Sequence, residues 1–387
     1  MLNLTGTPGE SISEVHNSSE KMEHHKLKRK SYGYKGRQYS IVSHDKHSVS
    51  PDVISSGACI RSIILDGDKP VCVSPLKSVP PDTFEWSETA HLKVTEFIDG
   101  TMINLFYSRA DSEWVTTTRN TIGANITFFR SDVFITFKQM FYDALGKYYP
   151  NPDDFYGELD THCSYSFVIQ HPNHRIVTPV SEPNLYLTAV YEIKDDATIQ
   201  YVDPFLLNVL IPIPRPPPII HNVPSVITPS ILRDIVAYTQ THWMRMGIHV
   251  VDVRTGMRTK IRNPEYEEMR RLRGNQPKLQ YRFLEILHNK DDLDKFVSVW
   301  PEYTEDINKY TEKLKILCKT IYQLYVGKFI THTLKINDIP PLYRKMLYSL
   351  HGIYLSNIGS VKINYNVTYN HIISSPTPQI MFLMSRM

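Results

Sequence analysis

The sequence predicts an α+β protein, in which an antiparallel-sheet domain is followed by an α-helical C-terminal domain. Short apolar runs that alternate with polar residues, separated by turn residues, fill the chain from about residue 51 to residue 260. Beyond Arg262 the apolar residues recur at helical spacing instead. We therefore expect a basic, disordered tail over residues 1–50, a sheet domain over 51–275 and a helical domain over 276–387.

The strand signals begin with a hairpin. Apolar runs at 61–65 and 71–73 flank the turn Asp66-Gly67-Asp68, and Asp-Gly between such runs favours a tight reversal. A strand, turn and strand series is expected over 94–107 and 113–118, with Asp99-Gly100 inside it. The remaining predicted strands are 164–169, 175–177, 185–193, 205–213 and 249–252.

Helices and connections follow from periodicity and proline content. Residues 132–145 place their apolar side chains on one helical face, and 309–327 and 341–354 have the clearest amphipathic periods of the C-terminal part. The proline-dense run 211–218 must be extended. Because a strand is predicted beyond it, this run is expected to connect two parts of one domain.

Composition limits the class of protein and its surroundings. The 387 residues are 41% hydrophobic and 21% charged with a net charge of +3, so binding to nucleic acid would need a local basic patch. The four cysteines form no CxxC pair, which argues against a zinc ribbon or a disulfide framework. No apolar run approaches the roughly 20 residues of a membrane span, and no signal peptide is recognised. We expect action in the cytoplasm or nucleus, without a membrane partner.

The N-terminal region contains a basic cluster at residues 24–30, His-His-Lys-Leu-Lys-Arg-Lys. Its composition is typical of a solvated tail. A nuclear-targeting or nucleic-acid-tethering arm is the second interpretation.

Six short blocks follow one another along the chain, at 61–65, 75–78, 96–103, 118–124, 166–177 and 259–264. The third block begins Glu96-Phe97-Ile98-Asp99-Gly100-Thr101. The order of the blocks resembles T-even phage-type RNA ligases and their relatives in large DNA viruses, and the resemblance covers roughly residues 55 to 265.

The resemblance implies a nucleotidyltransferase domain whose lysine, two residues before Asp-Gly, attacks the α-phosphorus of ATP. This chain has Phe97 at that position. It also has Ser166 where an acidic residue is expected and Met246 where a glutamate would help to hold the metal, although magnesium prefers oxygen ligands. An active member would need ATP, Mg²⁺ and RNA ends. The three changes predict a catalytically degenerate protein without a metal site.

The nucleotide-binding residues implied by the resemblance are Asp99, Gly100, Arg119, Lys260 and Arg262. Lys260 and Arg262 are two apart on a predicted strand and point to one face, which suits phosphate contact but also a plain solvent face. For Arg119, phosphate contact and a surface ion pair stay open.

Two other lysines are considered as substitutes for the missing nucleophile. Lys93 lies about 13 Å from Phe97 along an extended strand, which is too far for direct substitution. Lys77 lies in a proline-constrained loop, where a structural or phosphate-facing role is favoured over catalysis.

A second basic group is predicted to bind RNA through Arg270, Arg271 and Arg273, beside aromatic residues that could stack on bases. The competing interpretation is a junction between two domains.

The predicted function is a degenerate RNA ligase-like protein that binds nucleotide, RNA or both. The alternatives are an active ligase with a relocated lysine, and a virion or interaction protein that reuses the fold. The resemblance places the protein in an infected host cell or in the virion.

Overall fold

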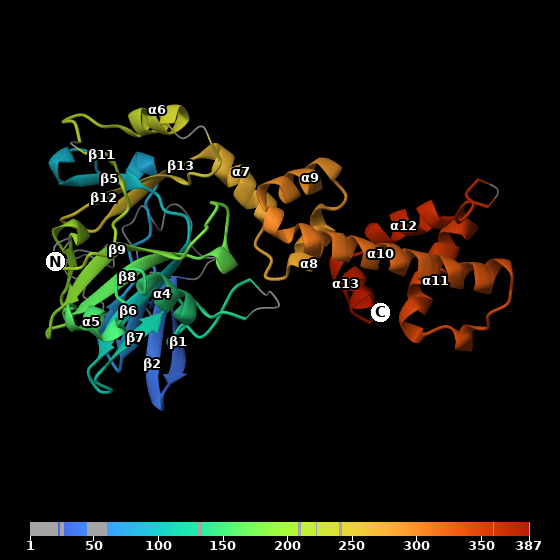
Figure 1. Ribbon diagram of the computed structural model, residues 1–387, viewed down its shortest axis with the longest axis horizontal. Coiled ribbons are helices and arrows are strands. Elements are labelled where there is room, and N and C mark those ends of the chain that lie inside the picture. The colour runs from blue at the N-terminus through green and yellow to red at the C-terminus, as the bar shows by residue number, and fades with distance from the viewer. Residues whose placement is uncertain are drawn as a thin grey trace. The chain divides into compact units, whose positions relative to one another are not determined.

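A computed structural model describes residues 22–23, 27–44, 60–129, 134–207, 210–221, 223–239, 242–358 and 360–386 (Figure 1). The chain divides into two compact units. Among the described residues, the first unit extends to Arg271, and the second contains Phe128, Phe129 and the residues from Leu272 onward. The sequence had placed this boundary after residue 275.

The first sheet of the first unit has the order β1-β2-β3-β4 and is antiparallel throughout. Its strands are β1 (Leu27–Tyr34), β2 (Arg37–His44), β3 (Ile63–Asp66) and β4 (Lys69–Val73). The predicted hairpin at 61–73 is confirmed as β3 and β4, with Gly67 in the turn at φ 61°.

The prediction of a disordered tail over residues 1–50 is wrong for residues 27–44, which form the β1–β2 hairpin. β1 is mostly exposed and polar, whereas Tyr39, Ile41 and Val42 of β2 are buried. The composition of residues 1–50 is polar on average, so the few apolar residues of β2 did not stand out as a strand in the sequence. Residues 24–26 of the basic cluster lie outside the described residues, and residues 28–30 are exposed on β1.

The second sheet has the order β10-β9-β8-β6-β7 and is also antiparallel. Its strands are β6 (Thr101–Ser108), β7 (Glu113–Thr117), β8 (Cys163–Gln170), β9 (Asn184–Ile193) and β10 (Ile199–Val202). Helices α4 (Phe137–Leu145) and α5 (Pro152–Gly157) share a core with it, in which Phe141, Phe155 and Phe167 are in ring contact.

The third sheet has the order β11-β5-β12-β13. Its strands are β5 (Leu92–Glu96), β11 (Pro218–Ile220), β12 (Gly247–Asp252) and β13 (Arg258–Arg262), and α6 (Pro229–Thr239) packs on one face (Figure 1). Leu232 and Val236 of this helix join a core with Val94, Ile248 and Ile261. The opposite face is therefore available for polar side chains.

Several predicted boundaries differ from the structure. The series expected over 94–107 is divided at residues 97–100, and its halves β5 and β6 belong to different sheets. Residues 175–177 form a turn region, because hydrogen bonds to Asp99 replace strand pairing. The expected strand 205–213 contains a short helical turn, Pro204–Leu207, and α4 begins at Phe137 because the hydroxyl of Thr136 caps it.

The run 211–218 connects two parts of the first unit, and its Arg215 is buried. The Arg215 guanidinium donates hydrogen bonds to the carbonyl oxygens of Pro204, Ile211 and Ile213, which fixes the extended course of this segment.

The C-terminal part is helical, as predicted. Helix α7 (Pro264–Arg273) is followed by α8 (Leu279–Ile286), α9 (Lys290–Val299), α10 (Thr304–Tyr325), α11 (Pro341–Ser356), α12 (Tyr365–Ile373) and α13 (Thr377–Ser385). Leu314, Leu317 and Ile321 lie on one side of α10 at helical spacing and are buried. The protein is thus of the predicted class, antiparallel sheets followed by C-terminal helices.

Candidate functional site

The candidate site lies on the face of the third sheet opposite α6. Side chains alternate between the two faces of a strand, and the register pairs His249 with both Thr95 and Lys260, and Gly247 with Arg262. Phe97, two residues beyond Thr95, and Arg258, two residues before Lys260, therefore share this face. The alternation brings together residues that lie more than 150 positions apart in the sequence.

Phe97 is surrounded by cationic and aromatic side chains. Its ring stacks on His249 with centroids 5.8 Å apart. Lys260 Nζ lies 5.7 Å and Arg262 Cζ 5.6 Å from the ring centroid. The Phe97 backbone N–H donates to the Gly247 carbonyl oxygen at 2.9 Å, which fixes the position of the ring. Position 97, where the resemblance predicts a nucleophilic lysine, therefore holds a phenyl ring, and the cations Lys260 and Arg262 lie beside it.

Lys260 has unusual electrostatic surroundings. Burial, together with the nearby charges of Arg262 and Arg258, lowers the pKa of Lys260 to about 8. It forms no ion pair with a carboxylate among the residues that the structure describes. Sequence reasoning did not consider this amine as a substitute for the missing lysine, because only the structure shows its proximity to Phe97.

His249 is kept neutral by the same surroundings. Burial and the charges of Arg258 and Lys260 lower the His249 pKa to about 3, and its Nε2 atom is buried without a hydrogen-bond partner. A neutral imidazole stacked on Phe97 extends the flat aromatic surface of the site.

Arg119 and Arg61 extend the positive charge. Burial lowers the pKa of both guanidinium groups, and the charges of Arg258 and Arg119 contribute to the Arg61 value of about 9. Arg119 forms no ion pair with any described carboxylate, so the surface ion pair left open by the sequence is not seen. We call Arg61, Arg119, Arg258, Lys260, Arg262 and Arg270 the basic face.

Arg262 is partly neutralised. Its Nη1 atom pairs with Glu267 Oε1, and Arg270 Nη1 lies 3.6 Å from the same oxygen. One carboxylate therefore serves two arginines, and the surroundings of Phe97 keep an excess of positive charge.

Asp99 has a structural position that the sequence did not predict. Its carboxylate is 6% exposed and accepts hydrogen bonds from the N–H groups of Val177 and Thr178 at 3.0 and 2.9 Å. Its other oxygen accepts one from the Tyr266 hydroxyl at 2.7 Å. Burial, followed by the Asp99 charge, raises the pKa of Tyr266. The predicted nucleotide contact by this carboxylate is not supported, because its oxygens bind the protein itself.

Gly100 is required by packing. A Cβ atom there would overlap the Ile169 carbonyl oxygen and lie 2.7 Å from Val168 Cγ1. The glycine thus lets the chain pass closely over β8, whereas the sequence had interpreted it as an approach to nucleotide.

Neither Ser166 nor Met246 can supply the carboxylate that the resemblance implies at its position. The Ser166 hydroxyl donates to Asn104 Oδ1 at 2.8 Å, and Asn104 Nδ2 donates to Ser74 Oγ at 2.8 Å, all buried. Within the described residues, no three His, Cys, Asp or Glu side chains form a group that could hold a metal ion. The donor set of this site does not fit a protein-bound Mg²⁺.

The predicted substitutes Lys77 and Lys93 lie in different surroundings. Lys93 is exposed, with its Nζ 5.9 Å from the ring centroid of Phe205. The loop that contains Lys77 runs beside β13, where the Val79 N–H donates to the Arg258 carbonyl oxygen at 2.9 Å. Lys77 is half-buried, and its phosphate-facing role stays a prediction.

The second predicted basic group is divided by the structure. Arg270 and Arg271 are exposed on α7. Arg273 is 2% exposed, its Cζ atom lies 3.9 Å from the centroid of Phe129, and its Nη2 donates to the Tyr303 hydroxyl at 3.3 Å. Arg273 thus packs inside the second unit, which argues against the predicted contact with RNA. Phe129 and Tyr303 bury its guanidinium group, and the spacing of the arginines along the sequence does not reveal this burial.

Sequence comparisons find two viral relatives, and no family model matches the chain. The chain is 24% identical over 234 residues to the immediate-early protein ICP-46 homolog of Invertebrate iridescent virus 3, covering 59% of this chain and 48% of the relative. It is 28% identical over 251 residues to an RNA ligase of Rhodothermus phage RM378, covering 57% and 54%. The chain therefore spans about half the length of the curated relatives it matches.

Solved structures of Naegleria gruberi RNA ligase show a weak overall similarity. The enzyme with PPi has a TM-score of 0.35 and 14% identity, covering 48% of this chain and 53% of that one. A mutant with AMP and Mn has a TM-score of 0.34 and 14% identity, covering 47% and 52%. Among these comparisons, the relation of this chain to RNA ligases rests on its 28% identity to the phage enzyme.

Proposed function

We propose that this chain is an RNA ligase-like protein that binds nucleotide or RNA phosphates on the basic face and does not form a covalent nucleotidyl intermediate at position 97. The observation that carries this proposal is Phe97 itself, with Lys260 and Arg262 within 6 Å of its ring centroid. The similarity to a phage RNA ligase supports the first part of the proposal, that the chain is RNA ligase-like. Covalent transfer at this position needs an amine, and a phenyl ring has none.

The charges of the site suit a phosphate chain. Lys260, Arg119 and Arg61 form no ion pairs with described carboxylates, and partly buried cations bind phosphate oxygens more strongly than exposed ones. The Phe97 and His249 rings offer a flat surface beside them. In this proposal Asp99 and Gly100 shape the site, and Arg119, Lys260 and Arg262 contact phosphate. ATP is the proposed nucleotide, whereas the acidic residues that would hold its metal are missing.

The second candidate is an active ligase in which another lysine has taken over. The position and lowered pKa of Lys260 favour it over Lys77 and Lys93 for this role. The match covers only about half of each viral relative. Any ligase activity of this protein is therefore proposed and does not follow from the match. No described helix is long and apolar enough to span a membrane.

The test is incubation with ATP labelled at the α-phosphate, with Mg²⁺, followed by denaturing separation. We expect no covalent AMP label on the protein. The same preparation should bind ATP in equilibrium dialysis, and the double variant K260A/R262A should bind it more weakly, with D294A as an exposed control.

A covalent label would contradict catalytic loss. Loss of that label in K260A, K77A or K93A, in a variant that still binds ATP in equilibrium dialysis, would identify the displaced nucleophile. A label that survives in all three would show that the alignment of Phe97 with the family lysine is wrong.

A further inference from the structure

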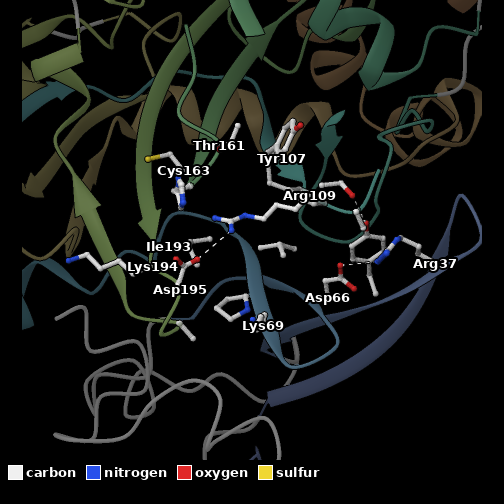
Figure 2. A pocket seen from close by; sticks show the side chains of 18 residues that line it. Arg37, Asp66, Lys69, Tyr107, Arg109, Thr161, Cys163, Ile193, Lys194 and Asp195 are labelled. Carbon is white, nitrogen blue, oxygen red and sulfur yellow. Dashed lines mark hydrogen bonds and ion pairs between the residues drawn. The ribbon is translucent and has the colours of Figure 1, made fainter. Parts of the chain in front are cut away.

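A cavity of about 300 Å³ lies in the first unit, away from the basic face (Figure 2). It is lined by the β3–β4 turn, the end of β6, the start of β8 and the β9–β10 turn. β6 begins at Thr101 beside Gly100 and reaches the cavity at Tyr107. Six residues of extended strand separate the two ends by about 20 Å. The cavity is therefore a separate site.

The wall of the cavity is apolar and partly aromatic. Tyr39 and Phe106 are in edge contact with ring centroids 6.1 Å apart, but they are 1% and 0% exposed, so they support the cavity from beneath and offer no open ring face. The accessible apolar lining is formed by Val71, Tyr107 and Ile193, which are half-buried. A flat ring beside aliphatic groups provides a surface on which a base can pack.

The charged side chains of the cavity are mostly cationic. Arg37, Lys69, Arg109 and Lys194 line it together with two carboxylates, Asp66 and Asp195. Arg37 is held by Asp66 at 3.2 Å and by Asp111 at 3.7 Å. Lys69 and Lys194 form no ion pair with any residue in the described part of the chain. Two cations are thus available to an anionic ligand.

An exposed ion pair spans the cavity. Figure 2 shows Arg109 extended toward Asp195, and Arg109 Nη1 lies 3.4 Å from Asp195 Oδ1. The side chains of Arg109 and Asp195 are 59% and 84% exposed, so this pair contributes little stability. A phosphate could therefore replace Asp195 as the partner of Arg109 at small cost.

We propose that this cavity binds one nucleotide, with its base against Val71, Tyr107 and Ile193 and its phosphate at Lys69, Lys194 and Arg109. The volume suits a single nucleotide and is too small for a folded RNA element. The nucleotide is either free or part of single-stranded RNA, since both present the same base and phosphate. This proposal does not depend on nucleotide binding at the basic face.

The test uses the full chain with the basic face disabled by K260E/R262E. In this background, binding of labelled AMP and of a labelled five-residue oligoadenylate is measured with and without K69E/K194E. The matched control is K309E/K313E, which makes the same charge change on exposed lysines of α10. Far-UV circular dichroism and thermal melting check that each variant is folded.

We expect K69E/K194E to reduce binding at least tenfold, with K309E/K313E within twofold of the background. Loss of AMP binding would identify a free-nucleotide site. Loss confined to the oligonucleotide, with a salt slope smaller by roughly 0.7 per lost phosphate contact, would identify an RNA site. Folded K69E/K194E that binds both ligands like the control, or a background that binds neither, would overturn the proposal. Failure of the basic-face proposal would show separately, as unchanged ATP binding in K260A/R262A.

Discussion

At the scale of single residues, the titration of Lys260 gives a direct test of phosphate binding. Its pKa is lowered to about 8, so the amine is mostly protonated at pH 7 and mostly neutral at pH 9. The phosphates of ATP stay ionised across this range. We expect ATP affinity to fall about tenfold from pH 7 to pH 9 at constant ionic strength, because the fraction of charged lysine falls by that factor.

The control for this prediction is K260R, since arginine stays protonated throughout the range. Isothermal titration calorimetry should show a much flatter profile for K260R, in which only the roughly twofold loss of charge on Arg61, whose pKa is about 9, remains. An equally steep profile in K260R would assign the pH dependence to another group.

Asp99 leads to a stability prediction at the same scale. D99A leaves the N–H groups of Val177 and Thr178 and the Tyr266 hydroxyl without their acceptor, so we expect a loss of about 3 kcal/mol or more. Y266F removes one of these hydrogen bonds and should cost about 1–2 kcal/mol. Urea unfolding measures both losses, and D294A, on an exposed helix surface, should be near neutral. A stable D99A protein with impaired ATP binding would instead favour the nucleotide contact predicted from the sequence.

At the scale of elements, Gly247 explains how β12 can approach β13 beside Phe97. The residue has φ of 134°, and a Cβ atom there would overlap the Ile261 carbonyl oxygen and lie 2.9 Å from Arg262 Cα. We expect G247A to lower stability by about 2 kcal/mol or more, because backbone cannot yield as a flexible side chain can. Thermal melting checks this, and G157A is the control, since a Cβ at Gly157 meets nothing within 4 Å.

Local patterns predicted many elements correctly, including the β3–β4 hairpin, β8, β9, β12 and helices α10 and α11. They also placed Lys260 and Arg262 on one strand face. The role of Asp99 could not be predicted in this way, because its partner Tyr266 is 167 residues away. The division between β5 and β6 was missed for a similar reason, since sheet membership depends on pairing with distant strands.

At the scale of the whole molecule, the arginines of α7 are expected to differ in role: two contact RNA and one stabilises the fold. Arg270 and Arg271 are exposed, and Arg273 is enclosed by Phe129 and Tyr303 of the second unit. We expect R270A/R271A to fold normally and to weaken single-stranded RNA binding, with a salt slope smaller by roughly 0.7 per lost contact. R273A should mainly lower the melting temperature.

Fluorescence anisotropy at several salt concentrations, with thermal melting of the same samples, distinguishes these outcomes. If folded R270A/R271A binds RNA with unchanged affinity and slope, α7 is a junction helix and supplies no support for nucleic-acid binding.

The buried hydrogen-bond chain of Ser74, Asn104 and Ser166 has a consequence for any attempt to build catalysis into this protein. Each member is almost fully enclosed, and each is neutral. An acidic side chain at position 166 would introduce a charge among partners that now hydrogen-bond a hydroxyl, and would lower stability. Under the proposed function, neither F97K alone nor S166E alone is therefore expected to give a covalent nucleotidyl label.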